Sequence, residues 1–154
     1  MNAKYDSEIQ ALRCEIDTGG ARPSVIDACV GVLLTEGGKS LAADLLSMLS
    51  DKAEYDEGMF TLVHAAESLD AAPYVSYVSA LLSVFPALFT SSPRWASIIL
   101  MRVMNGDASR HELVRQLRSA PAPVKESVRV MCARINEVSP EFLSKTVPVT
   151  LAAA

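Results

Sequence analysis

The chain has 154 residues, of which 50% are hydrophobic and 21% charged, which excludes a disordered chain and suffices for one folded core. The formal net charge of −4 is unevenly distributed, because residues 1–70 carry −8 and residues 71–154 carry +4. Since acidic side chains repel a phosphate backbone, this distribution argues against nucleic-acid binding by the N-terminal half.

Prolines mark the predicted helix starts along the chain, in RPSV, APYV, SPRW, APVK and SPEF. Proline fits the first turn of a helix, where its missing N–H is not needed. The matching stops are GG at 19–20, GG at 37–38 and NG at 105–106, because glycine and asparagine tolerate the backbone that ends a helix. The predicted helices are 5–17, 24–35, 39–50, 56–69, 73–89, 93–105, 108–119 and 123–138, with a short turn at 140–145.

These elements predict an all-α fold, a single domain of about eight helices over residues 1–150, stacked as antiparallel α-hairpins. The Pro-started units have no fixed period, so the fold is HEAT-like at most. The final LAAA, residues 151–154, resembles a vector-derived tail. The expected core comprises Leu45, Leu62, Leu82, Ile99, Leu100, Leu117, Val128 and Ile135.

The segment 71–93 contains no charged residue, but prolines and serines interrupt it. We interpret it as a buried helix with a polar strip of serines, and a membrane span is the minor alternative. The strip holds Ser76, Ser79 and Ser83, and the opposite apolar face holds Tyr74, Val78, Leu81, Leu82 and Phe85.

The N-terminal MNAKYDSEIQ has no apolar h-region, so we expect no signal peptide. Cys14, Cys29 and Cys132 form no CxxC pair and lie within helical apolar patterns, which suits a reducing cytoplasm. We therefore expect a cytoplasmic protein.

The stretch DKAEYDEGMF, residues 51–60, places four carboxylates and a tyrosine directly before an apolar helix. On this helix Met59 and its apolar companions share one face, whereas Glu57, Phe60, His64 and Glu67 share the opposite one. One interpretation is an ordinary solvated helix face. The other is a recognition surface in which an aromatic anchor is surrounded by carboxylates.

His64 with Glu57 and Glu67 has side chains capable of acid–base catalysis or metal binding, but this spacing is common on amphipathic helices. The chain has no HExxH, GxSxG, GxGxxG or P-loop motif. We therefore predict no enzyme activity, no catalytic residue, no metal and no cofactor.

The block SPRWASIILMRVMNGD predicts a central helix in which Trp95 and Arg102 share a face, with Arg102 in a structural role. The C-terminal third is rich in cations but has no aromatic residue between Trp95 and Phe142 for base stacking, so a solvated face is favoured over nucleic-acid binding. These cations are Arg110, Arg115, Arg118, Lys125, Arg129 and Arg134.

Four runs together, DEGMFTLVHAAESLD, the apolar helix from Tyr74 to FPAL, SPRWASIILMRVMN and HELVRQLR, resemble the all-α immunity proteins of bacterial polymorphic toxins, in particular those of contact-dependent growth inhibition systems. The similarity covers about residues 50–120, and the first fifty residues contribute little. It implies a cytoplasmic protein that binds and blocks the C-terminal domain of a toxin. Such toxins are often nucleases, including tRNA-cleaving ones.

A nuclease site is basic because it attracts polyanions, so clustered carboxylates would complement it. The expected partner is the toxin domain, without nucleic acid, membrane or small-molecule substrate. A HEAT-like interaction module without a toxin partner is the alternative. The resemblance assigns Trp95, Arg102 and Asn105 to the scaffold. The predicted acidic surface, which faces the toxin, comprises Asp51, Glu54, Tyr55, Asp56, Glu57, Phe60, His64, Glu67 and Asp70.

Overall fold

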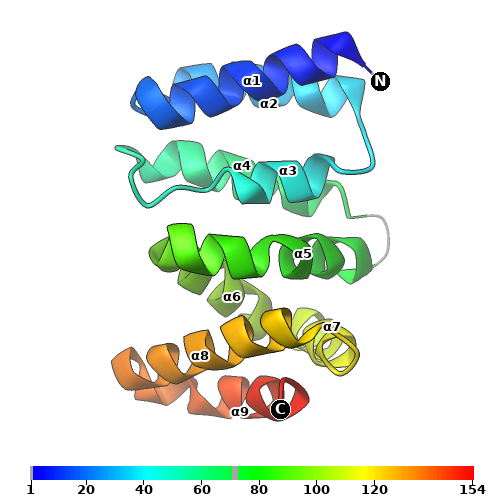
Figure 1. The fold of residues 1–154 in the computed structure, drawn as a ribbon, viewed down its shortest axis with the longest axis vertical. Coiled ribbons are helices and arrows are strands. Elements are labelled where there is room, and N and C mark those ends of the chain that lie inside the picture. Colours follow the sequence, from blue (N-terminus) through cyan, green and yellow to red (C-terminus); the bar gives the residue numbers. More distant parts are fainter. Residues whose placement is uncertain (1, 71–72) are drawn as a thin grey trace. The chain divides into compact units, whose positions relative to one another are not determined.

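A computed structural model describes residues 2–70 and 73–154 and contains no strand within these ranges. The predicted all-α fold of stacked helices is confirmed (Figure 1). The chain forms two compact units, one ending at Leu69 and the other beginning at Asp70. The single domain expected over residues 1–150 stays a prediction.

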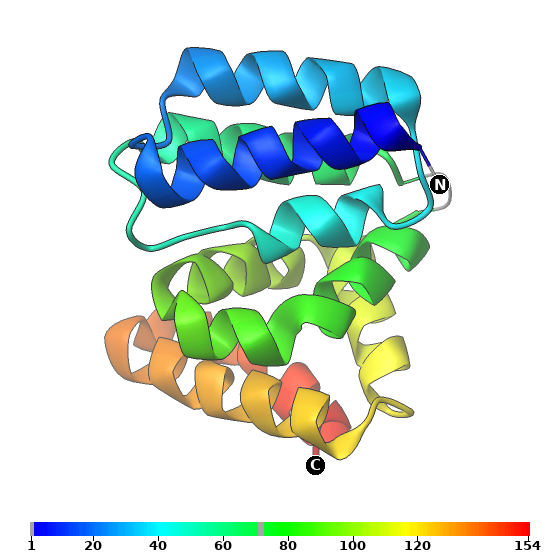
Figure 2. The same ribbon diagram turned by 45° about the horizontal axis from the view of Figure 1, so that its top comes forward.

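The first unit consists of two helical hairpins, α1 with α2 and α3 with α4 (Figure 1). Helix α2 packs against both α1 and α4, and α4 packs against α3. Figure 2 shows α1 and α2 running antiparallel, joined by a short turn. The bounds are α1 Ala3–Thr18, α2 Pro23–Glu36, α3 Leu41–Ser47 and α4 Asp56–Ser68.

The turn between α1 and α2 is built around the buried carboxylate of Glu15. It accepts hydrogen bonds from the backbone N–H of Arg22 at 2.9 Å and from the guanidinium Nη2 at 2.7 Å. A Cβ at Gly19 would lie 2.5 Å from Glu15 Oε1, so a larger residue there would have to displace the Glu15 carboxylate. Ala21 follows in the left-handed region with φ 55° and is fully buried. The turn is therefore fixed by local backbone geometry and by an ion pair between the buried Glu15 and the exposed Arg22.

In the second unit α5 packs against α6, α7 and α8, whereas the last helix, α9, packs against α7 and α8. Phe85 of α5 and Trp95 of α6 are the largest fully buried side chains in its core. The Ser109 hydroxyl donates to the carbonyl of Val103 at 2.5 Å and so ties α7 to the end of α6. The bounds are α5 Val75–Ser91, α6 Pro93–Asn105, α7 Asp107–Leu117, α8 Ala122–Val138, η1 Pro140–Phe142 and α9 Leu143–Ala152.

The expected core is confirmed, because all eight predicted residues are buried. In the apolar segment, Ser76, Ser79 and Ser83 form the expected exposed strip; residues 71 and 72 lie outside the described part. Among the described helices, none has the length and hydrophobicity needed to cross a membrane.

Several predicted boundaries are wrong, and the helix expected over 39–50 is the shorter α3, Leu41–Ser47. Pro73 does not start the following helix, because α5 begins at Val75 and Tyr74 precedes it with φ 65°, exposed rather than on the apolar face. The predicted turn at 140–145 instead continues into α9. Pro148 costs α9 one backbone hydrogen bond, but the burial of Thr146 and Val149 offsets that loss.

The last four residues take part in the fold. Leu151 and Ala152 complete α9, and Ala153 is fully buried. The Arg129 guanidinium donates to the carbonyl of Ala153 at 3.3 Å. The vector origin of residues 151–154 stays a prediction.

Candidate functional site

The acidic surface is positioned by the start of α4. Tyr55 precedes the helix in an extended conformation, with φ −122°, and Asp56 and Glu57 occupy the first turn. Carboxylates at this place interact favourably with the partial positive charge of the helix N-terminus. The same residues that start the helix are therefore available to form a negative surface.

The eight residues that belong to the first unit differ in exposure. Glu54, Tyr55, Glu57 and His64 are exposed, with Tyr55 at 42% and the His64 side chain at 62%. The remaining four, Asp51, Asp56, Phe60 and Glu67, are half-buried. The exposed four are the part of the acidic surface that a partner reaches most easily.

The two faces of α4 divide as the sequence predicts, because Met59, Leu62 and Val63 are fully buried. On the outer side the rings of Phe60 and His64 stack, with centroids 6.2 Å apart. His64 Nδ1 lies 3.3 Å from Glu67 Oε1. An aromatic pair and a carboxylate therefore form one continuous strip along the helix.

A carboxylate that the sequence did not reveal extends this surface onto α2. Asp27 is exposed, and its Oδ1 accepts a hydrogen bond of 2.8 Å from the Thr61 hydroxyl of α4. The same hydroxyl donates to the carbonyl of Glu57 at 3.1 Å. Asp27 lies far from the acidic stretch in the sequence, so only the packing of α2 against α4 identifies it.

Asp70 belongs to the second unit and has a local role there. Its Oδ1 accepts a hydrogen bond from the Ser76 hydroxyl at 2.6 Å and from the backbone N–H of Tyr77 at 3.3 Å. These bonds satisfy groups at the start of α5. The carboxylate therefore stabilises a helix start.

Two cations of the first unit are engaged with acids outside the acidic surface. Arg22 pairs with Glu15 at 2.7 Å, and Lys4 pairs with Glu36 at 3.4 Å. Hydrogen bonding from Arg22 lowers the pKa of Glu15 below its ordinary value, and hydrogen bonding from Asn2 and then Lys4 lowers that of Glu36. Arg22 and Lys4 thus pair with carboxylates that do not belong to the acidic surface.

The predicted scaffold residues lie on α6. Trp95 is fully buried, and the guanidinium carbon of Arg94 lies 5.5 Å from the centre of its ring. Asn105 accepts a hydrogen bond from the Lys145 ammonium of α9. Arg102 is exposed on the same helix. Trp95 and Asn105 thus contribute to packing within the second unit.

Most cations of the basic C-terminal third have partners within the second unit. Arg110 and Arg115 pair with Asp107 and Glu112, in line with a solvated, internally paired face. Arg129 pairs with Glu126, and Arg134 covers the ring of Phe89 at 4.6 Å.

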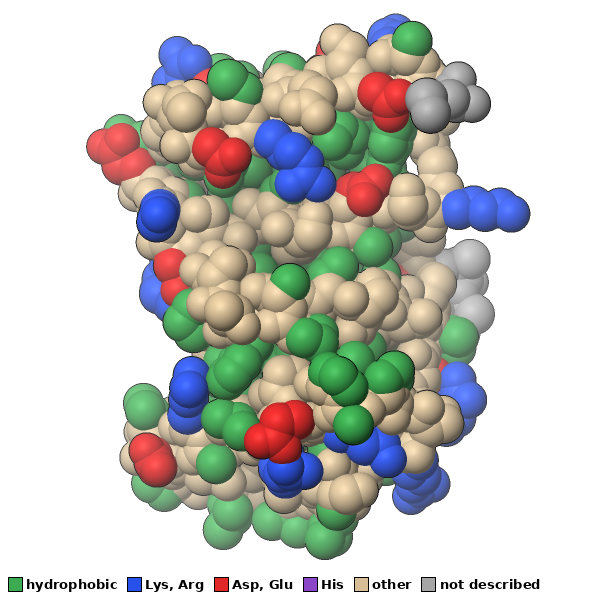
Figure 3. All heavy atoms as spheres, viewed as in Figure 1, with side chains coloured by type: hydrophobic (Ala, Val, Ile, Leu, Met, Phe, Trp, Pro, Cys, Tyr) green, Lys and Arg blue, Asp and Glu red, His purple; other side chains and the backbone are tan. Residues whose placement is uncertain are grey.

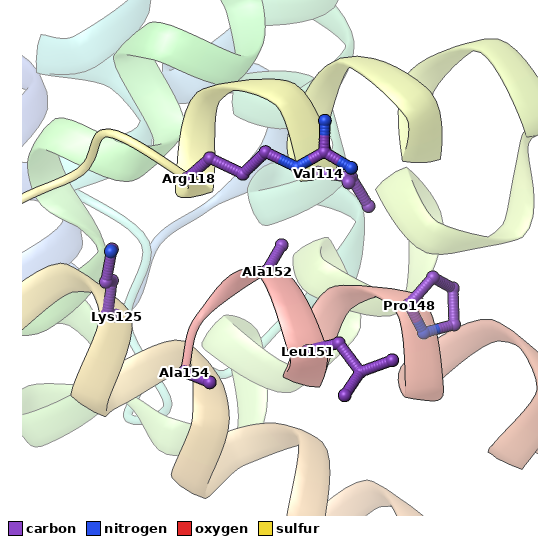
Figure 4. Close-up of a pocket in the computed structure, with 7 residues that line it drawn as sticks. All are labelled: Val114, Arg118, Lys125, Pro148, Leu151, Ala152 and Ala154. Atoms are coloured by element: carbon purple, nitrogen blue, oxygen red, sulfur yellow. The ribbon is translucent and has the colours of Figure 1, made fainter.

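Arg118 and Lys125 have no such partner in the described part of the chain and line a groove between α7, α8 and α9 (Figure 4). The groove has a volume of about 450 Å³. We call it the C-terminal groove, lined by Val114, Arg118, Lys125, Pro148, Leu151, Ala152 and Ala154.

His64 has the surroundings of a surface residue. Its side chain is mostly exposed, and it pairs with Glu67 of the same helix. Within residues 2–70 and 73–154, no three His, Cys, Asp or Glu side chains converge as a metal site would require. Its stacking on Phe60 instead suits a contact residue.

Comparison with known proteins gives one result. A family model described as Immunity protein 30 matches residues 21–113, whereas no curated protein and no solved structure matches the chain. The match begins at residue 21, so α2 and α3 belong to the family region, although the first fifty residues contributed little to the sequence resemblance. The expected relationship to the immunity proteins of polymorphic toxins is confirmed: the chain belongs to the Immunity protein 30 family.

Proposed function

We propose that this immunity protein neutralises a nuclease toxin by covering it with the acidic surface. The observation that carries the proposal is that four residues of the acidic surface, before and along α4, are exposed: Glu54, Tyr55, Glu57 and His64. Asp27 adds a further exposed carboxylate from α2. The surface thus combines negative charge with aromatic side chains.

The chemistry of the partner follows from the charge. A nuclease, including one that cleaves tRNA, presents a basic surface to its substrate. Carboxylates that approach this surface increase the association rate and compete with the nucleic acid. Their negative potential also disfavours acidic partners, which contributes to specificity.

The aromatic residues have a different role from the charges. Tyr55 is exposed, whereas Phe60 is half-buried and stacks against the ring of His64. Aromatic side chains buried at an interface slow dissociation more than they speed association. Tyr55 is therefore proposed as an anchor, with Glu54 and Glu57 guiding the approach.

The biological setting that we propose is contact-dependent growth inhibition, with the protein acting in the cytoplasm, where toxin nucleases meet their substrates. Cys14, Cys29 and Cys132 are free, in line with a reducing compartment. Family membership favours a toxin partner over the alternative of a HEAT-like module without one.

The test reverses two exposed charges of the acidic surface. Glu54→Lys with Glu57→Lys is expected to slow association with the cognate toxin domain by at least about tenfold at low salt and to reduce protection of toxin-producing cells. The matched control is Glu137→Lys with Glu141→Lys, which reverses two exposed acids of the second unit and is expected to leave protection unchanged.

Circular dichroism must show that both variants are folded, because a lysine in the first turn of α4 costs about 0.3–1 kcal/mol. Full protection by the folded Glu54→Lys/Glu57→Lys variant, with unchanged association kinetics, would refute the acidic surface as the toxin contact.

A further inference from the structure

We infer that the C-terminal groove binds the acidic segment 54–57 of a second copy of this chain, so that self-association competes with toxin binding. The part of the inference that concerns the toxin rests on the proposed function, whereas self-association itself does not. The groove lies wholly outside the family match, since its first lining residue is Val114 and the match ends at residue 113. The groove is therefore a feature of this chain beyond the family region.

The groove combines an apolar floor with two cations, Arg118 and Lys125, that have no ion-pair partner among the described residues. Arg118 follows the end of α7 and Lys125 lies in the first turn of α8, whereas Pro148, Leu151 and Ala152 come from α9 (Figure 4). Leu151 is 71% exposed. A partner segment would complement both features if it placed an apolar side chain against the floor and carboxylates beside Arg118 and Lys125.

Exposed hydrophobic side chains continue beyond the groove. Leu143, Val147 and Leu151 follow one another at four-residue spacing on α9 and are 51%, 44% and 71% exposed. Figure 3 shows hydrophobic side chains gathered over α8 and α9 on one face of the second unit. A row of exposed apolar residues beside the cations Arg118 and Lys125 indicates a protein contact.

The acidic segment 54–57 has the complementary composition. Tyr55 is exposed, with Glu54 before it and Glu57 after it, both exposed as well. A tyrosine on the apolar floor would leave these two carboxylates to pair with Arg118 and Lys125. The volume of about 450 Å³ is within the range of pockets that hold groups of this size.

Charge also favours this occupant on a larger scale. Residues 2–69 hold 12 acidic and 5 basic side chains, whereas residues 70–154 hold 6 and 9. The first unit of one copy and the second unit of another therefore attract each other. Because segment 54–57 is also the proposed toxin contact, a copy held in this way is not available to the toxin.

The first experiment measures the sedimentation of the full chain without toxin, over a range of protein concentrations. Self-association is expected at low salt, at about 20 mM, and is expected to weaken at about 500 mM, where charges are screened. A chain that remains monomeric at low salt and high concentration would overturn the inference.

Charge reversal locates the contact. Arg118→Glu with Lys125→Glu is expected to weaken self-association by at least about tenfold. The matched control is Arg13→Glu with Lys39→Glu, which changes net charge equally but leaves the groove intact, and is expected to retain self-association. Equal loss in both variants would contradict a role for the groove.

Mixing identifies the occupant. The Arg118→Glu/Lys125→Glu variant and the Glu54→Lys/Glu57→Lys variant are each expected to be monomeric, but their mixture is expected to associate, because an acidic groove then meets a basic segment. Leu151→Ser is expected to weaken self-association, whereas Val138→Ser, at an apolar position that is 84% exposed outside the groove, is not. A mixture that stays monomeric would exclude segment 54–57 as the occupant.

Addition of the cognate toxin domain separates this inference from the proposed function. Toxin is expected to dissociate the self-associated protein, and the groove variant is expected to bind toxin at least as well as the natural sequence. Weaker toxin binding by the groove variant would assign the groove to the toxin instead. If the toxin bound but left self-association intact, segment 54–57 would not be a contact that the groove and the toxin share.

Discussion

Glu15 is the residue whose charge is most closely tied to the fold of the first unit. It is buried, and the side chain and backbone N–H of Arg22 hold its carboxylate across the α1–α2 turn. These hydrogen bonds lower the pKa of Glu15 below its ordinary value of 4.5. The folded state therefore favours the ionised carboxylate.

The lowered pKa of Glu15 makes stability depend on pH in a defined direction. In the unfolded chain the carboxyl is protonated near its ordinary pKa, so its contribution to folding is present above that pH and is lost as pH falls through the lowered folded value. Glu15→Gln is expected to lower the urea midpoint of unfolding at about pH 7. The midpoint of this variant is also expected to decrease less than that of the natural sequence between about pH 7 and about pH 3.

The control for this prediction is Glu137→Gln, at an exposed acid of α8, which is expected to leave the urea midpoint unchanged at both pH values. If Glu15→Gln retained the full pH dependence of the natural sequence, the ion pair with Arg22 would not contribute to it.

At the scale of elements, two glycines within helices have opposite surroundings. A Cβ at Gly58 of α4 would lie 2.5 Å from Ile26 Cδ1 of α2 and 3.1 Å from the carbonyl oxygen of Ala21. A Cβ at Gly31 of α2 would meet no atom within 4 Å. Gly58 thus permits close packing of α4 against α2, whereas Gly31 faces open space.

Substitution of these two glycines by alanine is expected to change the stability of the protein in opposite directions. Gly58→Ala is expected to destabilise the protein by about 1–3 kcal/mol, because Ile26 is fully buried and cannot move without strain. Gly31→Ala is expected to stabilise it by about 0.4–1 kcal/mol, since alanine favours the helix and restricts the unfolded chain. Chemical denaturation measures both, and stabilisation by Gly58→Ala would show that the helices can separate at little cost.

The elements also show how far sequence patterns reach. Helix starts at Pro23 and Pro93 were predictable because proline acts through its own ring and missing N–H. The last helix was not predictable, because a proline such as Pro148 is unfavourable inside a helix. The burial of Thr146 and Val149, which stabilises this helix, depends on the rest of the fold. Asp27 likewise joins the candidate site through packing between helices, which periodicity along one segment does not reveal.

At the scale of the whole molecule, the distribution of charge matters more than its sum. The net charge of −4 is modest, yet the segment before α4 and its first turn concentrates acids in the first unit. At about 0.1 M salt the Debye length is about 10 Å, so a partner responds to the charges near its contact. Local charge should therefore govern toxin association if the acidic surface is the contact.

Two variants with equal net charge separate local from global effects. Glu54→Lys/Glu57→Lys and Glu137→Lys/Glu141→Lys each change the net charge from −4 to 0. The association rate with a basic toxin domain is expected to fall with rising salt for the natural sequence and for the second variant, and to depend far less on salt for the first. Tyr55→Ala is expected to raise the dissociation rate while leaving the salt dependence of association unchanged, since a buried aromatic anchor acts after the encounter. Stopped-flow kinetics at several salt concentrations measures all four proteins, and an equal loss of salt dependence in both charge variants would mean that net charge, rather than the acidic surface, steers the encounter.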